Sequence, residues 1–499
     1  MKKSILFLMI CVVACAASAE MRTMEQMQQI ARDILGQPQH SGNIHRMPAE
    51  DNHMQILRET DNMAFVGYAD GGFVVISKDD KNEAILGYSR DAVMNEILPD
   101  GLQWWIKAMD AALTINSTKS AMRKSPRRAP KKVIHPLIST KWGQRVPYYN
   151  LLKYPLDGKE YQFVTGCIAT AMSQIVKFYE YPVQGVGSHQ YYIKYSNVTD
   201  TLWLESDFSA HTYDYANMLD EYGSGGTAAQ KTAVATLMKD CGIAVEMKYN
   251  GVSSGAFSKD IPIALKTYFN YDDGVQLYKR SEQKLVYNNG AYVRDTVYNY
   301  TDEEWKQLII DELEACRPII YSGCDKTSGG HAFVVDGLDE KGFVHVNWGW
   351  NGSYDGYFDI DLLNPKDDSY AYLQDAVMGI VPKDPQFVPT YYTLSLCVQD
   401  PMTGSVTGGG IYKAGNEATI TATPENGYEF DRWSDNNTDN PRTITLVQDT
   451  SLTALFKQGI SMRFRDATDS PIPTKLIRDG QVFILRGEQT YTLQGQEVK

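Results

Sequence analysis

The segment 167–179 most constrains the fold, because it is typical of an amphipathic helix that begins with a cysteine between small residues. Its apolar side chains repeat at helical spacing and Pro182 ends the pattern, so Cys167 falls in the first turn. Backbone N–H groups in a first turn have no helical partners and stabilise an anion such as a thiolate. With a nearby imidazolium, such a position lowers a cysteine pKa from about 8.5 to roughly 3.5–7.5. The alternative is an inert cysteine buried in a core helix.

A second segment, 329–350, is typical of a β-hairpin, since both arms are rich in β-branched and aromatic residues. His331 and Asn347 each lie eight residues from Asp339, which predicts that they are cross-strand partners on one face. An Asn carbonyl placed there orients the imidazole, and the order Cys, His, Asn is that of a cysteine hydrolase. The alternative is a structural histidine in a strand. Gly330 lacks a Cβ and lets a bound peptide approach the imidazole.

Both segments resemble the streptopain-like cysteine peptidases, papain-fold enzymes of streptococci and Bacteroidetes. The resemblance rests on Thr165–Met172 with Tyr179–Pro182, and on Gly329–Gly337 with His345–Trp350. It implies an α+β fold, with a helical half, an antiparallel sheet half and the active site in the cleft between them. It also implies that Cys167 is the nucleophile, that His331 accepts the proton of its thiol, and that no cofactor is needed.

The same resemblance implies roles for further residues. Gln144 matches a glutamine whose side chain completes an oxyanion hole with the Cys167 N–H, and such a donor contributes about 3–4 kcal/mol when aimed at the developing charge. Asn347 and Trp348 resemble the Asn-Ser-Trp-Gly of the wider papain group without its serine, so Trp348 or Trp350 is expected to shield the dyad from water. Ser254 lies in a Ser-Ser-Gly run that resembles a loop lining the substrate pocket.

The amino terminus predicts export. Residues 1–19 carry a basic start, an apolar run and small residues before a cut after Ala19, as in a secretory signal, and the run is too short to remain as a membrane span. A lipoprotein anchor at Cys15 is the alternative. Removal of the signal leaves five cysteines, an odd number that fits one free reactive thiol. We therefore expect a secreted or cell-surface protein without a structural metal.

The charge distribution bears on the partners of the chain and on where it is cleaved. The formal net charge of −13 disfavours nucleic acid and anionic membranes as partners. Between Lys119 and Lys132 there are seven basic residues and no acidic one, with two prolines that prevent a helix. Accessible linkers of this kind are preferred cleavage sites, so we expect maturation between about Arg123 and Val133.

This linker separates a first module, 20–130, from a catalytic domain, 131–383. Residues 24–35, a hairpin at 64–76 and a helix at 102–113 make the first module α+β, and it resembles the propeptide of the same family. It is expected to act as an intramolecular inhibitor and chaperone. Within the catalytic domain the patterns predict helices at 214–222, 227–241 with Gly242 as the stop, 258–269, and one capped by Thr301 with Glu304.

The last part of the chain is expected to be all-β. Alternating strands and glycine-rich turns over 390–457 resemble the internalin-type B repeat, and 458–499 resembles a C-terminal sorting tail, which implies an export machinery as partner.

Taken together, the sequence predicts a secreted cysteine endopeptidase, made as a zymogen, that hydrolyses peptide bonds of host or environmental proteins. Two alternatives remain at this point: a catalytically silent surface-binding protein that acts through 390–457, and transglutaminase-like acyl transfer, which uses the same residue types.

Overall fold

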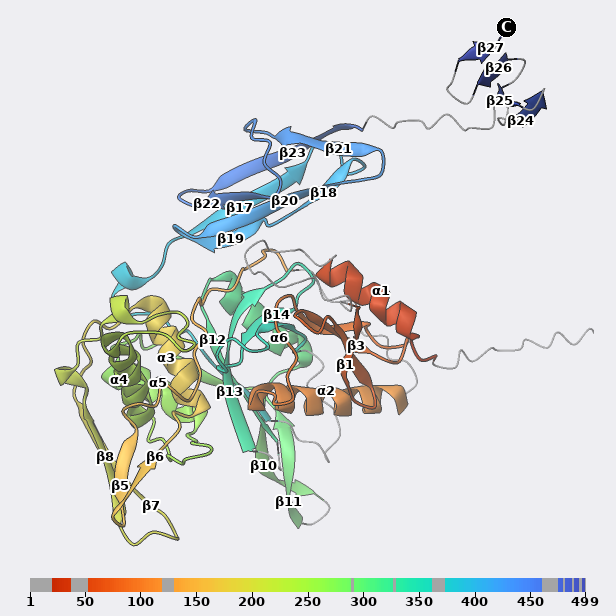
Figure 1. Ribbon diagram of the computed structural model, residues 1–499. Helices are drawn as coiled ribbons and strands as arrows, with labels where there is room; N and C mark the ends of the chain where they lie inside the picture. Colours follow the sequence, from red (N-terminus) through yellow and green to blue (C-terminus); the bar gives the residue numbers. More distant parts are fainter. Residues whose placement is uncertain are drawn as a thin grey trace, which may run out of the picture. The chain divides into compact units, whose positions relative to one another are not determined.

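The computed structural model describes residues 20–36, 53–118, 130–288, 291–325, 329–360, 373–459, 474–478, 481–486, 489–492 and 496–498. The chain forms two compact units (Figure 1). The first extends to Leu394 and includes 410–417 and 445–450, and the second contains 395–409, 418–444 and the chain from Ser451 onward. The expected signal peptide and most of the basic linker lie outside the described residues.

The first module has the predicted helix and hairpin. Helix α1 (Met24–Leu35) starts at Thr23, whose hydroxyl accepts the Gln26 N–H while the Gln26 side chain accepts the Thr23 N–H. This helix packs on two of the four strands β1 (Gln55–Glu59), β2 (Met63–Gly67), β3 (Phe73–Ser77) and β4 (Ile85–Ser89). Helix α2 (Asp100–Thr118) is longer at both ends than the predicted helix 102–113, and it buries Trp104 and Trp105.

The described residues of the catalytic part form four α-helices: α3 (Cys167–Tyr179), α4 (Ala228–Ala244), α5 (Ile261–Tyr268) and α6 (Asp302–Glu314). The capping box of Thr301 and Glu304 is confirmed. Figure 1 shows α3, α4 and α5 gathered on one side of the sheet strands. None of the helices among the described residues is long and apolar enough to cross a membrane.

Two helix predictions were wrong. The segment 214–222 holds only a short 3-10 turn, Tyr215–Asn217, in which the Asn217 and Met218 N–H groups donate to the carbonyls of Asp214 and Tyr215, three residues earlier. Helix α4 continues through Gly242 to Ala244. A Cβ at Gly242 would lie 2.1 Å from the Tyr249 hydroxyl, so this glycine serves close packing and is no stop signal.

One antiparallel sheet runs through both the first module and the catalytic part, in the order β1-β2-β3-β4-β15-β14-β13-β12-β16-β9. The catalytic strands are β9 (Gln276–Lys279), β12 (Ile319–Asp325), β13 (Gly329–Leu338), β14 (Val344–Asn347), β15 (Gly356–Phe358) and β16 (Leu373–Met378). The joint is the pairing of β4 with β15, where Tyr88 faces Tyr357 and Gly87 faces Phe358. A Cβ at Gly87 would lie 2.7 Å from the Phe358 ring, so the joint is closely packed.

Helix α2 packs across β12 and β13 of this sheet. The indole of Trp104 lies where a side chain at Gly323 would be, since a Cβ there would come within 2.2 Å of the ring. The same indole contacts Phe333, with ring centroids 6.2 Å apart. The first module is therefore bound to the catalytic part by strand pairing and by a buried tryptophan.

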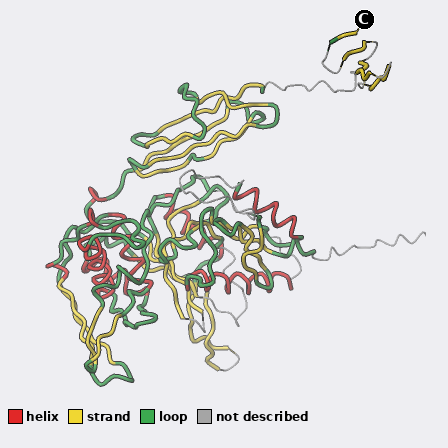
Figure 2. The backbone as a smooth tube through the Cα atoms, in the orientation of Figure 1, coloured by secondary structure: helices red, strands yellow, loops and turns green. Residues whose placement is uncertain are grey.

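Three two-stranded hairpins extend from the first unit (Figure 2): β5–β6 (Lys153–Leu156 and Lys159–Gln162), β7–β8 (Ser188–Lys194 and Thr201–Asp207) and β10–β11 (Ser281–Asn288 and Ala291–Tyr298). The β7–β8 pair carries exposed aromatic side chains, and Tyr192 lies directly opposite Trp203.

The region after Thr390 is all-β, as predicted. One sheet has the order β19-β17-β23-β21 and a second has the order β18-β20-β22. Their strands are β17 (Tyr391–Val398), β18 (Gly404–Thr407), β19 (Gly410–Lys413), β20 (Glu417–Pro424), β21 (Tyr428–Trp433), β22 (Arg442–Thr445) and β23 (Thr450–Gln458). A last small sheet contains β24 (Thr474–Arg478), β25 (Gln481–Arg486), β26 (Gln489–Thr492) and β27 (Glu497–Val498).

We predict that Trp104→Ala lowers the unfolding free energy of the full chain by about 3–5 kcal/mol, because it leaves a cavity between α2 and the sheet. Urea unfolding followed by fluorescence measures this. Trp203→Ala is the matched control, since Trp203 is 58% exposed, and should cost less than about 1 kcal/mol. Equal losses in the two variants would contradict the packing of α2 described above.

Candidate active site

The candidate nucleophile lies at the start of α3, as the sequence predicts. Gly166 precedes the helix with φ of +86°, a backbone conformation that residues other than glycine rarely adopt. A Cβ at Gly166 would lie 2.7 Å from the Met247 sulfur and 3.0 Å from the Ser254 carbonyl oxygen. Cys167 is half-buried, and its sulfur accepts a hydrogen bond from the Ala332 N–H at 3.4 Å. The helix start and the sheet therefore meet at this thiol.

The surroundings of the thiol raise its pKa in this form of the chain, which is the opposite direction to the sequence-based expectation. Burial raises the pKa of Cys167, and the nearby Asp100 carboxylate raises it further, while hydrogen bonds from the backbone N–H groups of Ala332 and Ile168 lower it. The first-turn N–H groups act in the predicted direction. Loss of hydration outweighs them, because a buried thiolate gives up the water that stabilises its charge.

The candidate base, His331, lies on β13 opposite Gly323 of β12. Its side chain is largely buried, and its Nδ1 is 4.0 Å from Oδ2 of Asp100, the first residue of α2. His331 directly precedes Ala332, so folding brings the imidazole-bearing strand next to the sulfur. A carboxylate from the first module thus lies beside the histidine of the expected dyad.

The predicted pairing of His331 with Asn347 was wrong. Asn347 faces Val334 on the neighbouring strand, and a β-bulge follows Val335. The hairpin closes from Leu338 to Val344, so its centre lies later in the chain than Asp339.

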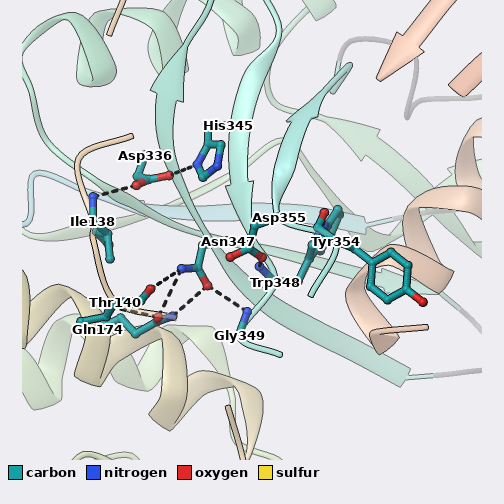
Figure 3. A network of polar contacts seen from close by, with 10 residues as sticks. All are labelled: Ile138, Thr140, Gln174, Asp336, His345, Asn347, Trp348, Gly349, Tyr354 and Asp355. Carbon is teal, nitrogen blue, oxygen red and sulfur yellow. Dashed lines mark hydrogen bonds and ion pairs between the residues drawn. The ribbon is translucent and has the colours of Figure 1, made fainter. Parts of the chain in front are cut away.

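Asn347 is buried at the junction of the helical and sheet halves (Figure 3). Its Oδ1 accepts hydrogen bonds from the Gln174 side chain at 3.1 Å and from the Gly349 N–H at 3.0 Å. Its Nδ2 donates to the Thr140 carbonyl at 2.8 Å and to Gln174 Oε1 at 3.2 Å. Gln174 is itself fully buried on α3 and also accepts the Trp142 N–H at 3.1 Å. These bonds connect the nucleophile helix with the turn after β14.

A second polar cluster lies beside this one (Figure 3). Oδ1 of Asp336 contacts the His345 Nδ1 at 2.6 Å, and its Oδ2 accepts the Ile138 N–H at 2.8 Å. The pKa of His345 is raised despite its burial, which by itself lowers it, because Asp336 stabilises the imidazolium. Burial raises the pKa of the neighbouring Asp355 carboxyl to about 7.

Trp348 forms the apolar side of the site. It is buried, its indole N–H donates to the Tyr354 carbonyl at 3.0 Å, and its ring contacts Phe333 with centroids 4.8 Å apart. Gly101 of α2 packs directly on this indole, since a Cβ at Gly101 would lie 2.8 Å from it. Trp348 and the first module therefore share an interface.

Gln144 lies close to the nucleophile through its backbone. Its carbonyl accepts the Thr165 N–H at 3.2 Å, two residues before Cys167, and the residue is half-buried. Among the described residues its side chain has no hydrogen-bond partner, so the amide is available to a ligand.

The two expected substrate-binding residues differ in their surroundings. The Ser254 side chain is buried, where it donates to the Val164 carbonyl at 2.7 Å and accepts the Asn250 N–H at 2.8 Å, so it shapes its loop from within. Gly330 is exposed on β13 opposite Cys324. A Cβ at Gly330 would be in ordinary contact at 3.7 Å or more, so packing within the chain does not require this glycine.

Sequence reasoning missed three residues of the site: Asp100, Gln174 and Ala332. Gln174 had a signal, because it is a polar side chain in an otherwise apolar part of the α3 pattern. Asp100 and Ala332 had none, since their roles depend on how α2 and β13 approach the nucleophile in three dimensions.

Comparisons with known proteins agree with this geometry. The model of the Peptidase C10 family matches residues 142–358, that of the Spi protease inhibitor matches 19–113, and that of the divergent InlB B-repeat domain matches 394–460. Streptopain of Streptococcus pyogenes is 32% identical over 347 residues, which cover 64% of this chain and 81% of streptopain. The chain belongs to the peptidase C10 family.

Two further similar proteins are also cysteine proteases or their precursors. The thiol protease/hemagglutinin PrtT of Porphyromonas gingivalis is 31% identical over 333 residues, which cover 62% of this chain and 36% of PrtT. Among solved structures, a fragment of Prevotella intermedia prointerpain A is 37% identical, with a TM-score of 0.56 over 67% of this chain and 100% of the fragment. The protein is thus a cysteine endopeptidase made with a propeptide, and the predicted papain-like α+β fold is confirmed. Family membership favours this function over the surface-binding and acyl-transfer alternatives.

We predict that Asp100→Asn in the full-length precursor accelerates iodoacetamide labelling of Cys167 about threefold or more at pH 7–8. Asp100 raises the pKa of the thiol, so its removal lowers that pKa and increases the thiolate fraction at a given pH. The labelling profile therefore shifts to lower pH. Peptide mapping by mass spectrometry measures the rate at Cys167, and Asp61→Asn, a change at an exposed propeptide carboxylate, is the control. An unshifted profile would show that the carboxylate does not act on the thiol.

We also predict that Asn347→Ala lowers the unfolding free energy by about 2–4 kcal/mol, because it leaves the buried Gln174 amide and Thr140 carbonyl without partners. Chemical denaturation measures this loss. The exposed Asn197 provides the control, and Asn197→Ala should change stability by less than about 0.5 kcal/mol. A neutral Asn347→Ala would mean that the amide network does not hold the two halves together.

Proposed function

We propose that Cys167 is the nucleophile of this peptidase and His331 its proton acceptor and donor. The observation that carries the proposal is the hydrogen bond from the Ala332 N–H to the Cys167 sulfur, because it places the residue next to His331 in contact with a thiol at a helix start. His331 directly precedes Ala332 on β13, and in this proposal its imidazole pairs with the thiol once the Asp100 carboxylate leaves. The resulting ion pair is the reactive form of such a dyad.

The proposed reaction has two steps. In the first, the Cys167 thiolate adds to the peptide carbonyl, and the Cys167 N–H and the Gln144 side chain donate hydrogen bonds to the oxyanion. Expulsion of the amine, protonated by the His331 imidazolium, leaves an acyl-enzyme. In the second step, the neutral His331 removes a proton from water, which attacks the thioester and releases the acid and the thiol. No cofactor takes part in this proposal.

Asn347 and Trp348 support the dyad without reacting in it. Asn347 positions α3 against the turn after β14 through Gln174 and Gly349. Trp348 covers the apolar side of the site and limits the access of water. This replaces the expected cross-strand role of Asn347 as the orienter of His331.

Latency follows from the contacts of α2. Asp100 lies 4.0 Å from His331, Gly101 packs on Trp348 and Trp104 fills the space above Gly323. The propeptide thereby attracts the imidazole to its own carboxylate and raises the pKa of the thiol. We propose that it is an intramolecular inhibitor, and that cleavage between about Arg123 and Val133 begins activation.

The remaining assignments concern the life cycle of the chain. We propose a signal peptide at 1–19, a propeptide at 20–130, a catalytic domain at 131–383, a surface spacer at 390–457 and a sorting tail at 458–499 recognised by an export machinery. The mature enzyme then acts outside the cell, or at its surface, on host or environmental proteins. The B-repeat match over 394–460 supports the spacer.

A Cys167→Ala variant tests the catalytic proposal. We expect loss of peptide hydrolysis by about a thousandfold or more, because no other group supplies the nucleophile. Wild-type enzyme should lose activity on saturable labelling of Cys167 by a thiol-directed epoxide. Cys397→Ala, which removes an exposed thiol of the C-terminal module, is the control and should keep full activity. Undiminished hydrolysis by Cys167→Ala would refute the assignment.

The same variant tests self-processing. If maturation is autocatalytic, purified Cys167→Ala stays uncut in the linker while wild type shortens, as gel electrophoresis and N-terminal sequencing show. A shorter form of the variant, obtained without other proteases, would refute autocatalysis and leave the peptidase activity itself untouched.

A further inference from the structure

A pocket of about 480 Å³ lies beside the segment that leads to the nucleophile. It is formed by the end of the β7 strand and by the loop 248–257, and its lining includes Lys194, Tyr195, Lys248, Ser253, Gly255 and Phe257. Neither the proposed mechanism nor the latency contacts use it. The inference drawn from it rests on the proposed peptidase function, because it assigns a substrate preference to the same site.

The pocket wall is held by its own hydrogen bonds. Lys248 and Gly255 pair across the loop, with N–H to carbonyl distances of 2.8 and 3.3 Å. The Tyr195 hydroxyl donates to the Tyr249 carbonyl at 2.5 Å, and the Val252 N–H donates to the Asn250 side chain at 2.8 Å. These bonds fix the shape of the loop before a ligand arrives.

The same loop is bound to the chain just before Cys167. The Val164 N–H donates to the Asn250 carbonyl at 3.1 Å, and the Ser254 hydroxyl donates to the Val164 carbonyl at 2.7 Å. Cys167 is three positions after Val164, and three extended residues span at most about 10 Å. A substrate whose scissile bond lies at Cys167 therefore brings side chains about two to four positions away within reach of the pocket.

The pocket is basic in an acidic protein. Lys194 and Lys248 line it, and the ammonium groups of Lys248 and Lys259 lie 5.9 and 5.3 Å from the centre of the Phe257 ring. Within the described ranges none of these three lysines forms an ion pair. The formal net charge of the whole chain is −13, so this group of lysines is a local positive patch on a protein that is negative overall.

Two acids lie near the group. Glu246, close in sequence, contacts His189 at 3.1 Å. Asp260 follows Lys259 in the chain, and burial raises the pKa of its carboxyl while Lys259 lowers it. Phe257 is 60% exposed and provides an apolar wall for the methylene groups of a bound side chain. A carboxylate on a short aliphatic stem matches this combination of ammonium groups and ring.

We propose that this pocket is a substrate subsite that accepts an acidic side chain two to four residues from the scissile bond. The occupant is an extended segment of the substrate. Lys194 and Lys248 would bind its carboxylate, and Phe257 would pack on its stem. The enzyme would thus select acidic peptides on one side of its cleft, a preference separate from the residue next to the bond.

The test uses matured enzyme from the full chain and fluorogenic peptides that share one scissile sequence. A single residue is varied among Glu, Gln and Lys at each of four positions on both sides of the bond. At one position two to four residues away, kcat/KM for Glu should exceed that for Gln about fivefold, as expected for one partly exposed charge interaction. High salt should reduce the ratio.

Charge-changing variants assign the preference to the pocket. The double variant Lys194→Gln with Lys248→Gln should bring the Glu-to-Gln ratio near one. Lys248→Glu should reverse the order and favour Lys over Glu. Lys159→Gln removes an exposed lysine of the β5–β6 hairpin outside the pocket and should leave the ratio intact.

The outcomes separate this proposal from the catalytic one. If wild type hydrolyses all peptides with no acidic preference at any position, or if the pocket variants keep that preference, the subsite proposal is wrong and the peptidase stands. If wild type hydrolyses none of the peptides, the peptidase proposal is wrong, and the subsite proposal that rests on it is wrong as well.

Discussion

The paired amides of Asn347 and Gln174 hold this catalytic domain together at its centre. Two donors and two acceptors face each other across the junction of α3 and β14, and both side chains are buried. Each amide is satisfied only when the helical half and the sheet half stand in one relative position, because burial makes an unpaired polar group costly. The nucleophile at the start of α3 and the histidine on β13 depend on that position.

The precursor structure shows how chemical environment decides the state of a thiol. A helix start favours the thiolate, and the backbone of Cys167 provides that influence. Burial acts in the opposite direction and is the largest influence on the pKa of the thiol, and the Asp100 carboxylate adds a smaller effect in the same direction. The proposed nucleophile and base are therefore in place in the precursor, while the surroundings expected to activate them are not. Removing the Asp100 carboxylate would change the surroundings of both proposed residues, since its Oδ2 also lies 4.0 Å from His331 Nδ1.

Local patterns predicted the elements but not the way they meet. Helix α3, the first-turn position of Cys167 and the capping box of α6 follow from periodicity and short-range hydrogen bonds, which the sequence displays directly. The register of the β13–β14 hairpin cannot be derived from such local patterns. The Asp339 side chain accepts N–H groups of Lys341 and Phe343, which lengthens the turn, and the bulge after Val335 shifts the pairing again. A shift in register exchanges partners along the entire strand. The contact of Asp100 with His331 lay beyond sequence reasoning, because it joins modules distant in the chain.

The joint between β4 and β15 has a consequence for activation. Cutting the linker removes a covalent connection, yet the strand pairing and the tryptophan of α2 remain in place. A nicked molecule is thus a two-chain complex whose site is still closed. Departure of the severed fragment uncovers a strand edge at β15 with unsatisfied backbone groups, which is a template for rebinding. On the proposed latency, hydrolysis of the linker and onset of activity would be separate events, and the second would depend on dilution or destruction of the fragment.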